Sequence, residues 1–295
     1  MARLLESLAE IGRQPPNPRS RWRPAPALVG SFALHAAALP ALLAWPAAWP
    51  QLLALLIADH ATLSGLCFLP RSSLLGPSIG RLPAAAAARG EVALTFDDGP
   101  DPAVTPRVLD LLDRHGARAS FFCIGRRALA HSALVRDIVQ RGHSVENHSF
   151  RHAGLFAAWS LPAIRRDLLH AQTVLTATAG VPPQFVRAPF GIRSPLFDPA
   201  LAGTGLRHVA WTARGRDTVC GDPRTVLDRL TRRLTAGNVL LLHDGTSAVT
   251  PGGEKVVLTV LPALLRAITA RGLHPVTLRT ALLGAGQGSN GPVSR

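Results

Sequence analysis

Residues 91–100 read Glu-Val-Ala-Leu-Thr-Phe-Asp-Asp-Gly-Pro, and this stretch decides the expected fold. An apolar run of strand character, 92–96, ends here in two adjacent carboxylates, Asp97 and Asp98, and a Gly-Pro turn. Further runs of strand character follow at 119–124, 144–147, 185–188, 208–211, 239–243 and 275–278. Helix-like stretches lie between them, at 103–115, 132–141, 162–179, 223–236 and 256–271. Strands that alternate with helices predict a parallel α/β sheet, either doubly wound or closed into a short barrel.

The composition excludes several classes of protein. The chain has 295 residues, and 47% of them are apolar, so it can bury a core and is not disordered as a whole. Three widely spaced cysteines, Cys67, Cys123 and Cys220, exclude a disulfide scaffold and a Cys-rich zinc module. Lys and Arg number 32 against 18 Asp and Glu, a net charge of +14. This excess favours a polyanion, an acidic membrane surface or an anionic substrate without choosing among them.

The chain divides into five segments. Ahead of the α/β domain lie a basic tail, a pair of apolar runs and a Pro/Gly-rich linker, and a polar, Gly-rich tail follows it. The boundaries are 1–24 for the basic tail, 25–70 for the apolar pair, 71–90 for the linker, 91–283 for the α/β domain and 284–295 for the final tail. We expect the final tail to be disordered, because it is short, polar and rich in glycine.

The two apolar runs, 28–45 and 49–69, predict a transmembrane helical hairpin. As helices they are about 27 and 31 Å long, against roughly 30 Å of bilayer hydrocarbon. Trp45 and Trp49 flank the uncharged turn, where interfacial aromatic residues belong. Both outer flanks carry arginines, so the positive-inside rule predicts a cytoplasmic location for both ends and for the α/β domain. The alternative is a pair of buried helices that pack on a soluble domain.

Polar residues interrupt the second apolar run and have one counterpart in the first. Asp59 and His60 lie in the second run, and an antiparallel hairpin places His35 of the first run level with Asp59. A lone carboxylate inside a membrane costs about 2.5–3.5 kcal/mol, so a partner is expected. We expect a structural polar contact between the helices. A binding site for a lipid head group or a proton is the alternative.

Polar residues of the α/β domain gather after its strands. In parallel α/β folds, ligands bind beyond the carboxyl ends of the strands. Asp97 and Asp98 point in different directions there, so that one can ligate a metal while the other acts as a base. An isolated Asp-Asp-Gly-Pro string would instead be read as a turn. His148 and His152 are four residues apart, which on a helical turn puts two imidazoles on one face, as a zinc site needs. Together with Asp98 they would leave positions open for water and substrate, as in a catalytic site.

Two further strand ends carry candidate catalytic side chains. Arg187 ends the run that begins at residue 185, and an arginine there can hold an aspartate ionised and oriented. His243 closes the apolar run 239–243. It is a candidate general acid, and a buried core histidine is the alternative.

Together these motifs resemble the polysaccharide deacetylase family with the NodB homology domain, carbohydrate esterase family 4. The resemblance extends over about 91–283 and rests on Thr-Phe-Asp-Asp-Gly-Pro, His-Ser-x-x-His, Arg-x-Pro-Phe and Leu-x-His in this order. It implies a deformed (β/α) barrel of about seven parallel strands. It also implies a divalent metal, usually Zn²⁺, and a hydrolase that removes N-acetyl groups from amino sugars.

The resemblance also implies roles for particular residues. The metal ligands would be Asp98, His148 and His152. The catalytic residues would be Asp97 as base, Arg187 as its holder, and His243 as acid, tuned by Asp217. The substrate pocket would be formed by the Phe190 N–H at an oxyanion hole and by Leu241 and Trp211. Thr218 stands where the family pattern has a tryptophan, so we expect a wider or differently shaped acyl pocket.

The expected substrate is an N-acylated amino sugar in a polysaccharide or a lipid-linked glycan. One alternative is a deformylase or deacetylase of a polyprenyl-phosphate-linked sugar at the cytoplasmic face of the membrane. Arginines on loops after the motif strands would then meet the phosphates, or they form a solvated basic surface: Arg151, Arg193, Arg214 and Arg216. The other alternative is a non-catalytic sugar-binding relative. A nucleic-acid partner is not expected, because the arginines lack interleaved aromatic residues.

Overall fold

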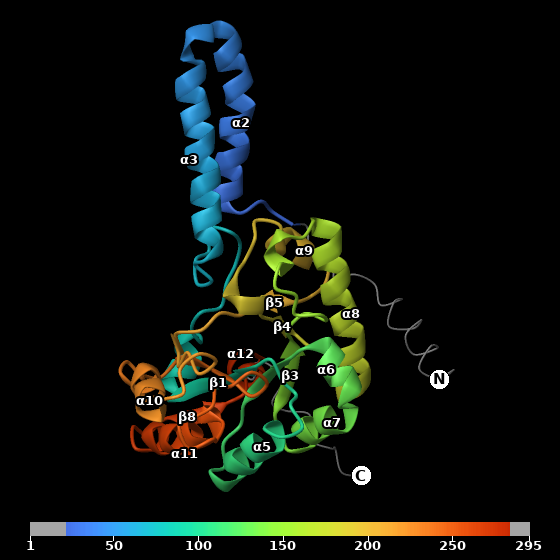
Figure 1. The fold of residues 1–295 in the computed structure, drawn as a ribbon, viewed down its shortest axis with the longest axis vertical. Coiled ribbons are helices and arrows are strands. Elements are labelled where there is room, and N and C mark those ends of the chain that lie inside the picture. The colour runs from blue at the N-terminus through green and yellow to red at the C-terminus, as the bar shows by residue number, and fades with distance from the viewer. Residues whose placement is uncertain (1–21, 284–295) are drawn as a thin grey trace, which may run out of the picture.

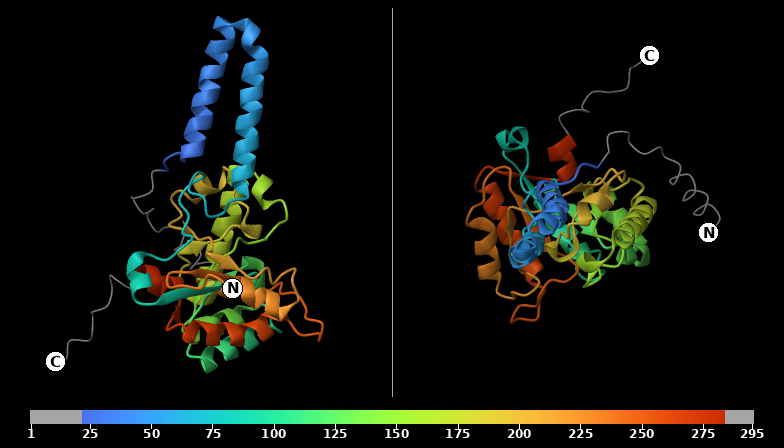
Figure 2. Two further views of the ribbon diagram at one scale, coloured as in Figure 1. Left: turned by 90° about the vertical axis from the view of Figure 1, so that its left-hand side faces the viewer. Right: turned by 90° about the horizontal axis from the view of Figure 1, so that it is seen from above.

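The computed structural model describes residues 22–283 and has two parts, a long helical hairpin and an α/β domain (Figure 1). The hairpin stands away from the domain, and its two helices run side by side in every view (Figure 2). The predicted tail 284–295 and most of the predicted tail 1–24 lie outside the described residues.

The domain is built on a sheet of eight strands whose pairings are all parallel. Seven strands follow the order β5-β4-β3-β2-β1-β7-β6, and β8 pairs with β1. Their bounds are β1 Glu91–Asp97, β2 Ser120–Cys123, β3 Ser144–Asn147, β4 Phe185–Val186, β5 Arg207–His208, β6 Ala213–Arg214, β7 Val239–His243 and β8 His274–Val276. The sequence did not predict β6, whose two residues lie just beyond the predicted strand 208–211.

The sheet curls because the chain between β5 and β6 crosses from one edge toward the other. Val209 N–H donates to Val186 O on β4 at 2.9 Å, and Thr212 N–H donates to Val239 O on β7 at 2.8 Å. The predicted strand 208–211 therefore ends early, at His208, where the chain bends across this gap. The result is an open, curled half-barrel, which confirms the predicted deformed barrel.

Most helices of the domain cover the outer side of the sheet, whereas two short helices, at 84–88 and 278–283, pack against its inner face beside Ala93 and Phe122. The helices that are only five or six residues long were not predicted, because they are too short for a helical repeat. One of these short helices, Ala84–Ala88, lies in the predicted linker. The helices of the domain are α4 Ala84–Ala88, α5 Thr105–Arg114, α6 Gly125–Ala130, α7 Ser132–Gln140, α8 Leu161–Ala179, α9 Phe197–Leu201, α10 Pro223–Thr231, α11 Val256–Thr269 and α12 Leu278–Leu283.

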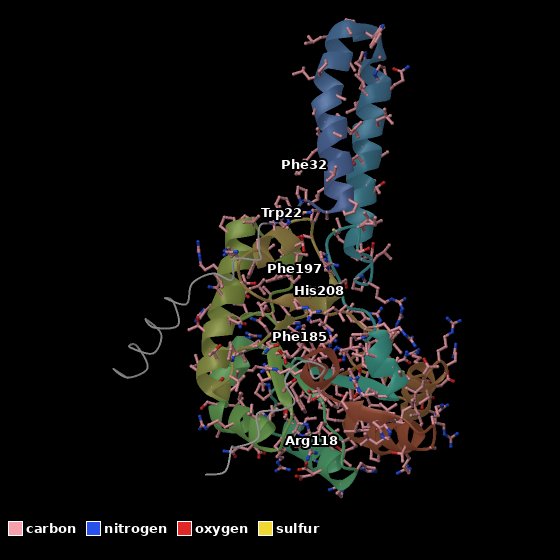
Figure 3. The ribbon with its side chains drawn as sticks, turned by 180° about the vertical axis from the view of Figure 1, so that it is seen from behind. Trp22, Phe32, Arg118, Phe185, Phe197 and His208 are labelled. Carbon is pink, nitrogen blue, oxygen red and sulfur yellow. The ribbon has the colours of Figure 1, made fainter. Side chains whose placement is uncertain are left out.

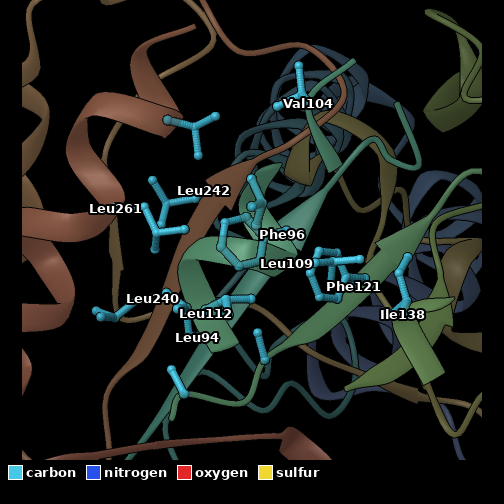
Figure 4. Close-up of a cluster of buried hydrophobic side chains, with 14 of the residues drawn as sticks. Leu94, Phe96, Val104, Leu109, Leu112, Phe121, Ile138, Leu240, Leu242 and Leu261 are labelled. Carbon is cyan, nitrogen blue, oxygen red and sulfur yellow. The ribbon is translucent and has the colours of Figure 1, made fainter. Parts of the chain in front are cut away.

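The two faces of β1 separate the core from the site. Successive side chains on a strand point to opposite faces. Leu94 and Phe96 pack in the core between the sheet and the helices, against Leu109 of α5 and Leu261 of α11 (Figure 4). The residues between and after them, Thr95 and Asp97, therefore face the inside of the half-barrel. The alternation in β1 thus directs Asp97 into the interior.

The hairpin consists of α2 (Pro26–Ala44), a short 3₁₀ turn (Pro46–Ala48) and α3 (Trp49–Cys67). Its apolar side chains are largely exposed, such as Phe32, which projects from α2 in Figure 3. The alternative of two buried helices on a soluble domain is therefore wrong. Among the described helices, α2 alone is long and apolar enough to span a membrane by length and composition. α3 has the same length, but Gln51, Asp59 and His60 make it more polar.

The linker is held to the domain by Arg193, which is almost fully buried. Its guanidinium donates to the carbonyl oxygens of Ser72 at 3.1 Å and of Leu75 and Gly76, each at 3.2 Å. The backbone N–H of Arg193 donates to Cys67 O, at the end of α3, at 3.0 Å. The expectation that Arg193 meets a substrate phosphate is therefore wrong, because linker carbonyls occupy its guanidinium.

Candidate active site

The predicted site residues meet at the carboxyl end of the sheet. Asp97 of β1 lies in register with His243 of β7. Asn147 of β3 lies in register with Val186 of β4, so His148 and Arg187 follow on neighbouring strands. The resulting cavity has a volume of about 640 Å³ and is open on one side.

Asp98, His148 and His152 form a cluster in the wall of this cavity. Nε2 of His148 lies 3.2 Å from Asp98 Oδ1, and Nε2 of His152 lies 3.1 Å from the same oxygen. Burial opposes ionisation of Asp98, but the two imidazoles hold the pKa of its carboxyl well below the usual range. Asp98 has a left-handed backbone, φ 72°, which is uncommon outside glycine and aims its side chain into the cluster.

The two histidines converge without a helix, contrary to the predicted helical turn. Residues 148–152 form an irregular turn in which Ser149 and His152 have φ values of 61° and 50°. Ser149 Oγ accepts the His152 N–H at 3.0 Å and stabilises this turn. The spacing in sequence therefore predicted the right pair of residues through the wrong backbone.

Neighbouring groups orient two of the three side chains. His148 Nδ1 lies 3.0 Å from Arg187 O, so Nδ1–H donates a hydrogen bond to this carbonyl. The lone pair of Nε2 is then free to bind a metal. Thr246 Oγ1 donates to Asp98 Oδ2 and leaves Oδ1 facing the imidazoles. The sequence analysis missed Thr246. The signal for it was a hydroxyl three residues past the strand-end histidine.

Arg127 is a second residue that the sequence analysis missed. Its Nη1 donates to Asp98 O at 2.9 Å and to Gly245 O at 3.0 Å, and so ties the loops after β1 and β7 together. A side chain on Gly245 would place Cβ 2.1 Å from Asp98 O, so only glycine permits this approach.

The cluster fits a divalent metal of the zinc type. Asp98 Oδ1 is buried and has no hydrogen-bond partner among the described residues, although two imidazole nitrogens face it. Buried carboxylate oxygens are normally paired, so this arrangement suits a cation between the three donors. Two nitrogens and one oxygen are a common catalytic zinc set that leaves a coordination position open.

Asp97 is held from the interior of the half-barrel by Arg187. The two side chains are buried, with Nη1 2.5 Å from Asp97 Oδ1. The same guanidinium donates to Thr95 Oγ1 at 3.0 Å and to the carbonyls of Val209 and Ala210 at 3.2 and 3.1 Å. Arg187 is thus the one fixed positive charge that contacts Asp97 directly in the described chain.

His243 is paired with Asp217 as predicted. Its Nδ1 lies 2.9 Å from Asp217 Oδ1, and its backbone N–H donates to Oδ2 of the same carboxylate at 2.8 Å. Burial lowers the pKa of His243, but the hydrogen bond and charge of Asp217 outweigh it and raise the pKa to about 9, with Asp97 and Asp98 adding to the effect. A pKa of about 9 means that His243 carries a proton at neutral pH in the absence of a metal. A buried core histidine would have no need of this charge.

Aromatic and aliphatic side chains complete the cavity. Trp211, Leu241 and the half-exposed Phe190 line it, and the Phe190 ring lies 4.6 Å from that of His152. Phe190 has φ 59°, and the next residue, Gly191, has no room for a side chain, because its Cβ would lie 2.4 Å from the Trp211 ring. Thr218 also lines the cavity.

The four loop arginines have different locations. Arg214 and Arg216 line the catalytic cavity. Arg151 lines a separate surface hollow beside Asp167, 3.9 Å from its carboxylate. Arg193 is buried under the linker. Only two of the four arginines therefore face the site.

A second cavity of about 670 Å³ adjoins the first. It lies at the base of α3, where Phe68 and Arg71 form one side, and it shares Phe190, Trp211 and Arg214 with the catalytic cavity. The end of the hairpin and the catalytic centre are thus connected by shared walls.

A parallel half-barrel carries this constellation at its strand ends, and comparisons with known proteins identify the class of protein to which the chain belongs. The family described as polysaccharide deacetylase matches residues 85–209. A chitooligosaccharide deacetylase of Sinorhizobium fredii is 36% identical over 154 residues, 52% of this chain and 72% of that protein. This chain therefore belongs to the polysaccharide deacetylase family.

Solved structures share the fold. The crystal structure of a peptidoglycan N-acetylglucosamine deacetylase is 28% identical, with a TM-score of 0.61, and the match covers 70% of this chain and 92% of that one. An acetyl xylan esterase of Clostridium thermocellum, solved with a cobalt ion, is 30% identical with a TM-score of 0.58, covering 65% and 89%. These two solved proteins are thus named for the removal of acetyl groups from peptidoglycan N-acetylglucosamine and from acetyl xylan.

The pairing of His243 with Asp217 predicts a measurable change in Asp217→Asn. The substitution removes the negative charge that raises the His243 pKa, so this pKa falls from about 9 toward or below the ordinary value near 6.5. An NMR titration of the metal-free protein measures it. Asp228→Asn, on the exposed face of α10, is the control and leaves the His243 pKa unchanged. An unchanged pKa in Asp217→Asn contradicts the assigned cause.

Proposed function

We propose that this chain is a metal-dependent hydrolase that removes an N-acetyl or similar N-acyl group from an amino sugar of a glycan. The observation that carries the proposal is the meeting of three units at one cavity: the Asp98 cluster, the Asp97–Arg187 pair and the His243–Asp217 pair. The names of the relatives support an amino-sugar substrate. We take residues 91–283 as the catalytic domain.

The metal would be held by Asp98, His148 and His152, with Zn²⁺ the best match to two imidazoles and one carboxylate. When bound, it would polarise the acyl carbonyl and lower the pKa of a water molecule. The orientation of Asp98 by Thr246 and of His148 by the carbonyl of Arg187 supports this role.

Asp97 is the proposed general base. It takes a proton from the attacking water as the water oxygen bonds to the acyl carbon. Arg187 contacts only one oxygen of Asp97, Oδ1, and so leaves Oδ2 for the proton. The proposed role of the Phe190 N–H is to donate to the carbonyl oxygen as its negative charge develops.

His243 is the proposed general acid. When the C–N bond breaks, the leaving amine takes a proton from Nε2, because Nδ1 is engaged by Asp217. Leu241 and Trp211 would bound the pocket for the acyl group. Thr218 in the cavity lining, where the family pattern has a larger tryptophan, supports acyl groups other than acetyl as substrates.

Asp97→Asn tests the assignment of the base. The neutral amide cannot take the proton of water, so we expect kcat to fall at least about 100-fold. Metal content is expected to stay at the wild-type level, because Asp97 is not among the proposed ligands. Deacetylation of a chito-oligosaccharide and elemental analysis measure the two effects. Asp110→Asn, a surface variant, is the control. A variant Asp97→Asn with the wild-type rate contradicts the assignment.

A second candidate substrate, a sugar linked to a lipid through phosphate, is favoured by the cavity at the base of α3. Arg71 and Arg214 line this cavity, and Arg214 and Arg216 line the catalytic one. Within residues 22–283, none of the three forms a salt bridge. Burial and the charge of Arg216 lower the pKa of Arg214, as expected where cations gather without an anion. A phosphate would supply the missing negative charge.

Substitution of Arg71 and Arg214 by Gln distinguishes the two substrates. With a phosphorylated sugar lipid, we expect kcat/KM to fall about 10- to 100-fold per arginine, the value of one charge-assisted hydrogen bond. With a neutral chito-oligosaccharide, we expect kcat/KM to fall only slightly. Arg151→Gln, which alters the separate hollow, is the matched control. An equal loss on both substrates contradicts phosphate recognition and leaves deacetylation standing.

We also propose that α2 and α3 anchor the protein in a membrane with the catalytic domain in the cytoplasm. The exposed apolar surface of the hairpin and the arginines on both of its flanks support this topology.

A reporter fused after Arg295 tests the topology. We expect a green fluorescent protein to be fluorescent there and an alkaline phosphatase to be inactive, because the phosphatase needs an oxidising compartment. Active phosphatase at this position contradicts the cytoplasmic assignment. Loss of the fusion from the membrane fraction contradicts the anchor.

A further inference from the structure

We propose that the hairpin carries a second metal site, for a divalent cation of the zinc type, formed by His35 of α2 and by Asp59 and His60 of α3. One ligand atom from each of the three side chains lies within 4.8 Å of the others. The imidazole rings of His35 and His60 lie 5.2 Å apart at an angle of 64°. Neither the family resemblance nor the proposed deacetylation uses these residues.

The hairpin cluster repeats the donor set of the catalytic cluster. Each combines two imidazoles with one carboxylate, and the ring separation is 4.8 Å for His148 and His152, close to the 5.2 Å in the hairpin. This donor set suits Zn²⁺ and similar cations better than Mg²⁺ or Ca²⁺, which prefer oxygen ligands.

The groups around the hairpin cluster repeat the same arrangement. His35 Nδ1 lies 2.8 Å from Ser31 O, so Nδ1–H donates to this carbonyl and leaves Nε2 as the free donor, as in His148. Ser31 Oγ donates to Asp59 Oδ2 at 2.7 Å and leaves the other carboxylate oxygen available, as Thr246 does for Asp98. A backbone carbonyl and a hydroxyl thus orient the ligands in both clusters.

The surroundings make an uncoordinated cluster unfavourable. The hairpin is apolar, and Ser31 is the only side chain that the described structure pairs with Asp59 by a hydrogen bond. A carboxylate inside a membrane needs compensation, and a cation supplies it while two imidazoles complete the site. His35 and His60 are exposed at the hairpin surface, so the described structure leaves both imidazoles accessible to an ion. A bound ion would link α2 to α3 by coordination. The predicted polar contact between the helices is the hydrogen bond from Ser31 to Asp59, and the proposed ion would add to it.

Metal stoichiometry of the full-length protein in detergent tests the inference. Each protein is stripped with EDTA, reloaded with Zn²⁺, freed of excess metal by gel filtration and analysed for zinc. We expect two ions per chain in the wild type and one in His60→Gln and in Asp59→Asn. His115→Gln is the matched control, because His115 is exposed and its Nδ1 likewise lies near the carbonyl four residues before it, yet it belongs to no cluster. This variant keeps two ions.

His148→Gln separates this inference from the proposed catalytic metal. If both sites exist, His148→Gln keeps the hairpin ion and binds one. If only the hairpin site exists, the wild type binds one ion, His60→Gln binds none and His148→Gln binds one. The inference is overturned if His60→Gln and Asp59→Asn bind as much zinc as the wild type. Circular dichroism verifies that each variant keeps its helices, and where one variant loses them, the other decides.

Discussion

The buried ion pair between Arg187 and Asp97 is the interaction on which both the fold and the site depend. Arg187 directly follows strand β4, and its guanidinium contacts Thr95 and Asp97 of β1. It also reaches the β5–β6 crossover through the carbonyls of Val209 and Ala210. One guanidinium thus bridges the interior where the sheet is not closed by strand pairing. Removing either partner of such a pair costs about 3–5 kcal/mol, because a buried charge is left uncompensated. The residue that holds Asp97, the proposed base, therefore also bridges the open side of the half-barrel.

Much of this arrangement was predictable from the sequence, because strand ends meet at one edge of a parallel sheet whatever the detailed backbone. That rule was enough to bring Asp98, His148 and His243 together. It was not enough for the irregular turn at 148–152, which depends on left-handed residues that no periodic pattern marks. Thr246 and Arg127 were missed for a related reason. Their partners come from loops more than a hundred residues distant in the chain or from backbone carbonyls, and neither leaves a trace in spacing.

The net charge of +14 has a clearer meaning once the arginines are placed. Arg127, Arg187 and Arg193 are internal ties whose guanidinium groups are taken up by carbonyl oxygens or by Asp97. Such arginines add positive charge without marking a surface for polyanions. Three others face the two cavities, Arg71, Arg214 and Arg216, and two of these, Arg71 and Arg214, lie at the base of α3. The positive charge that can act on the substrate is therefore local, so the high isoelectric point does not by itself indicate a polyanionic partner.

The hairpin is attached to the site by the loop that follows β4. Arg193 N–H donates to Cys67 O at the end of α3, and Phe190 lies three residues earlier in the same loop. Phe190 and Trp211 form walls of both cavities, and Gly191 is packed against the Trp211 ring. One hydrogen bond thus connects the end of α3 to the loop that carries Phe190, a wall of both cavities. If the hairpin lies in a membrane, the membrane orients the mouth of the cavity as well as holding the protein. A substrate that itself sits in the membrane then meets the catalytic centre in a defined direction, whereas a free oligosaccharide gains nothing from this geometry.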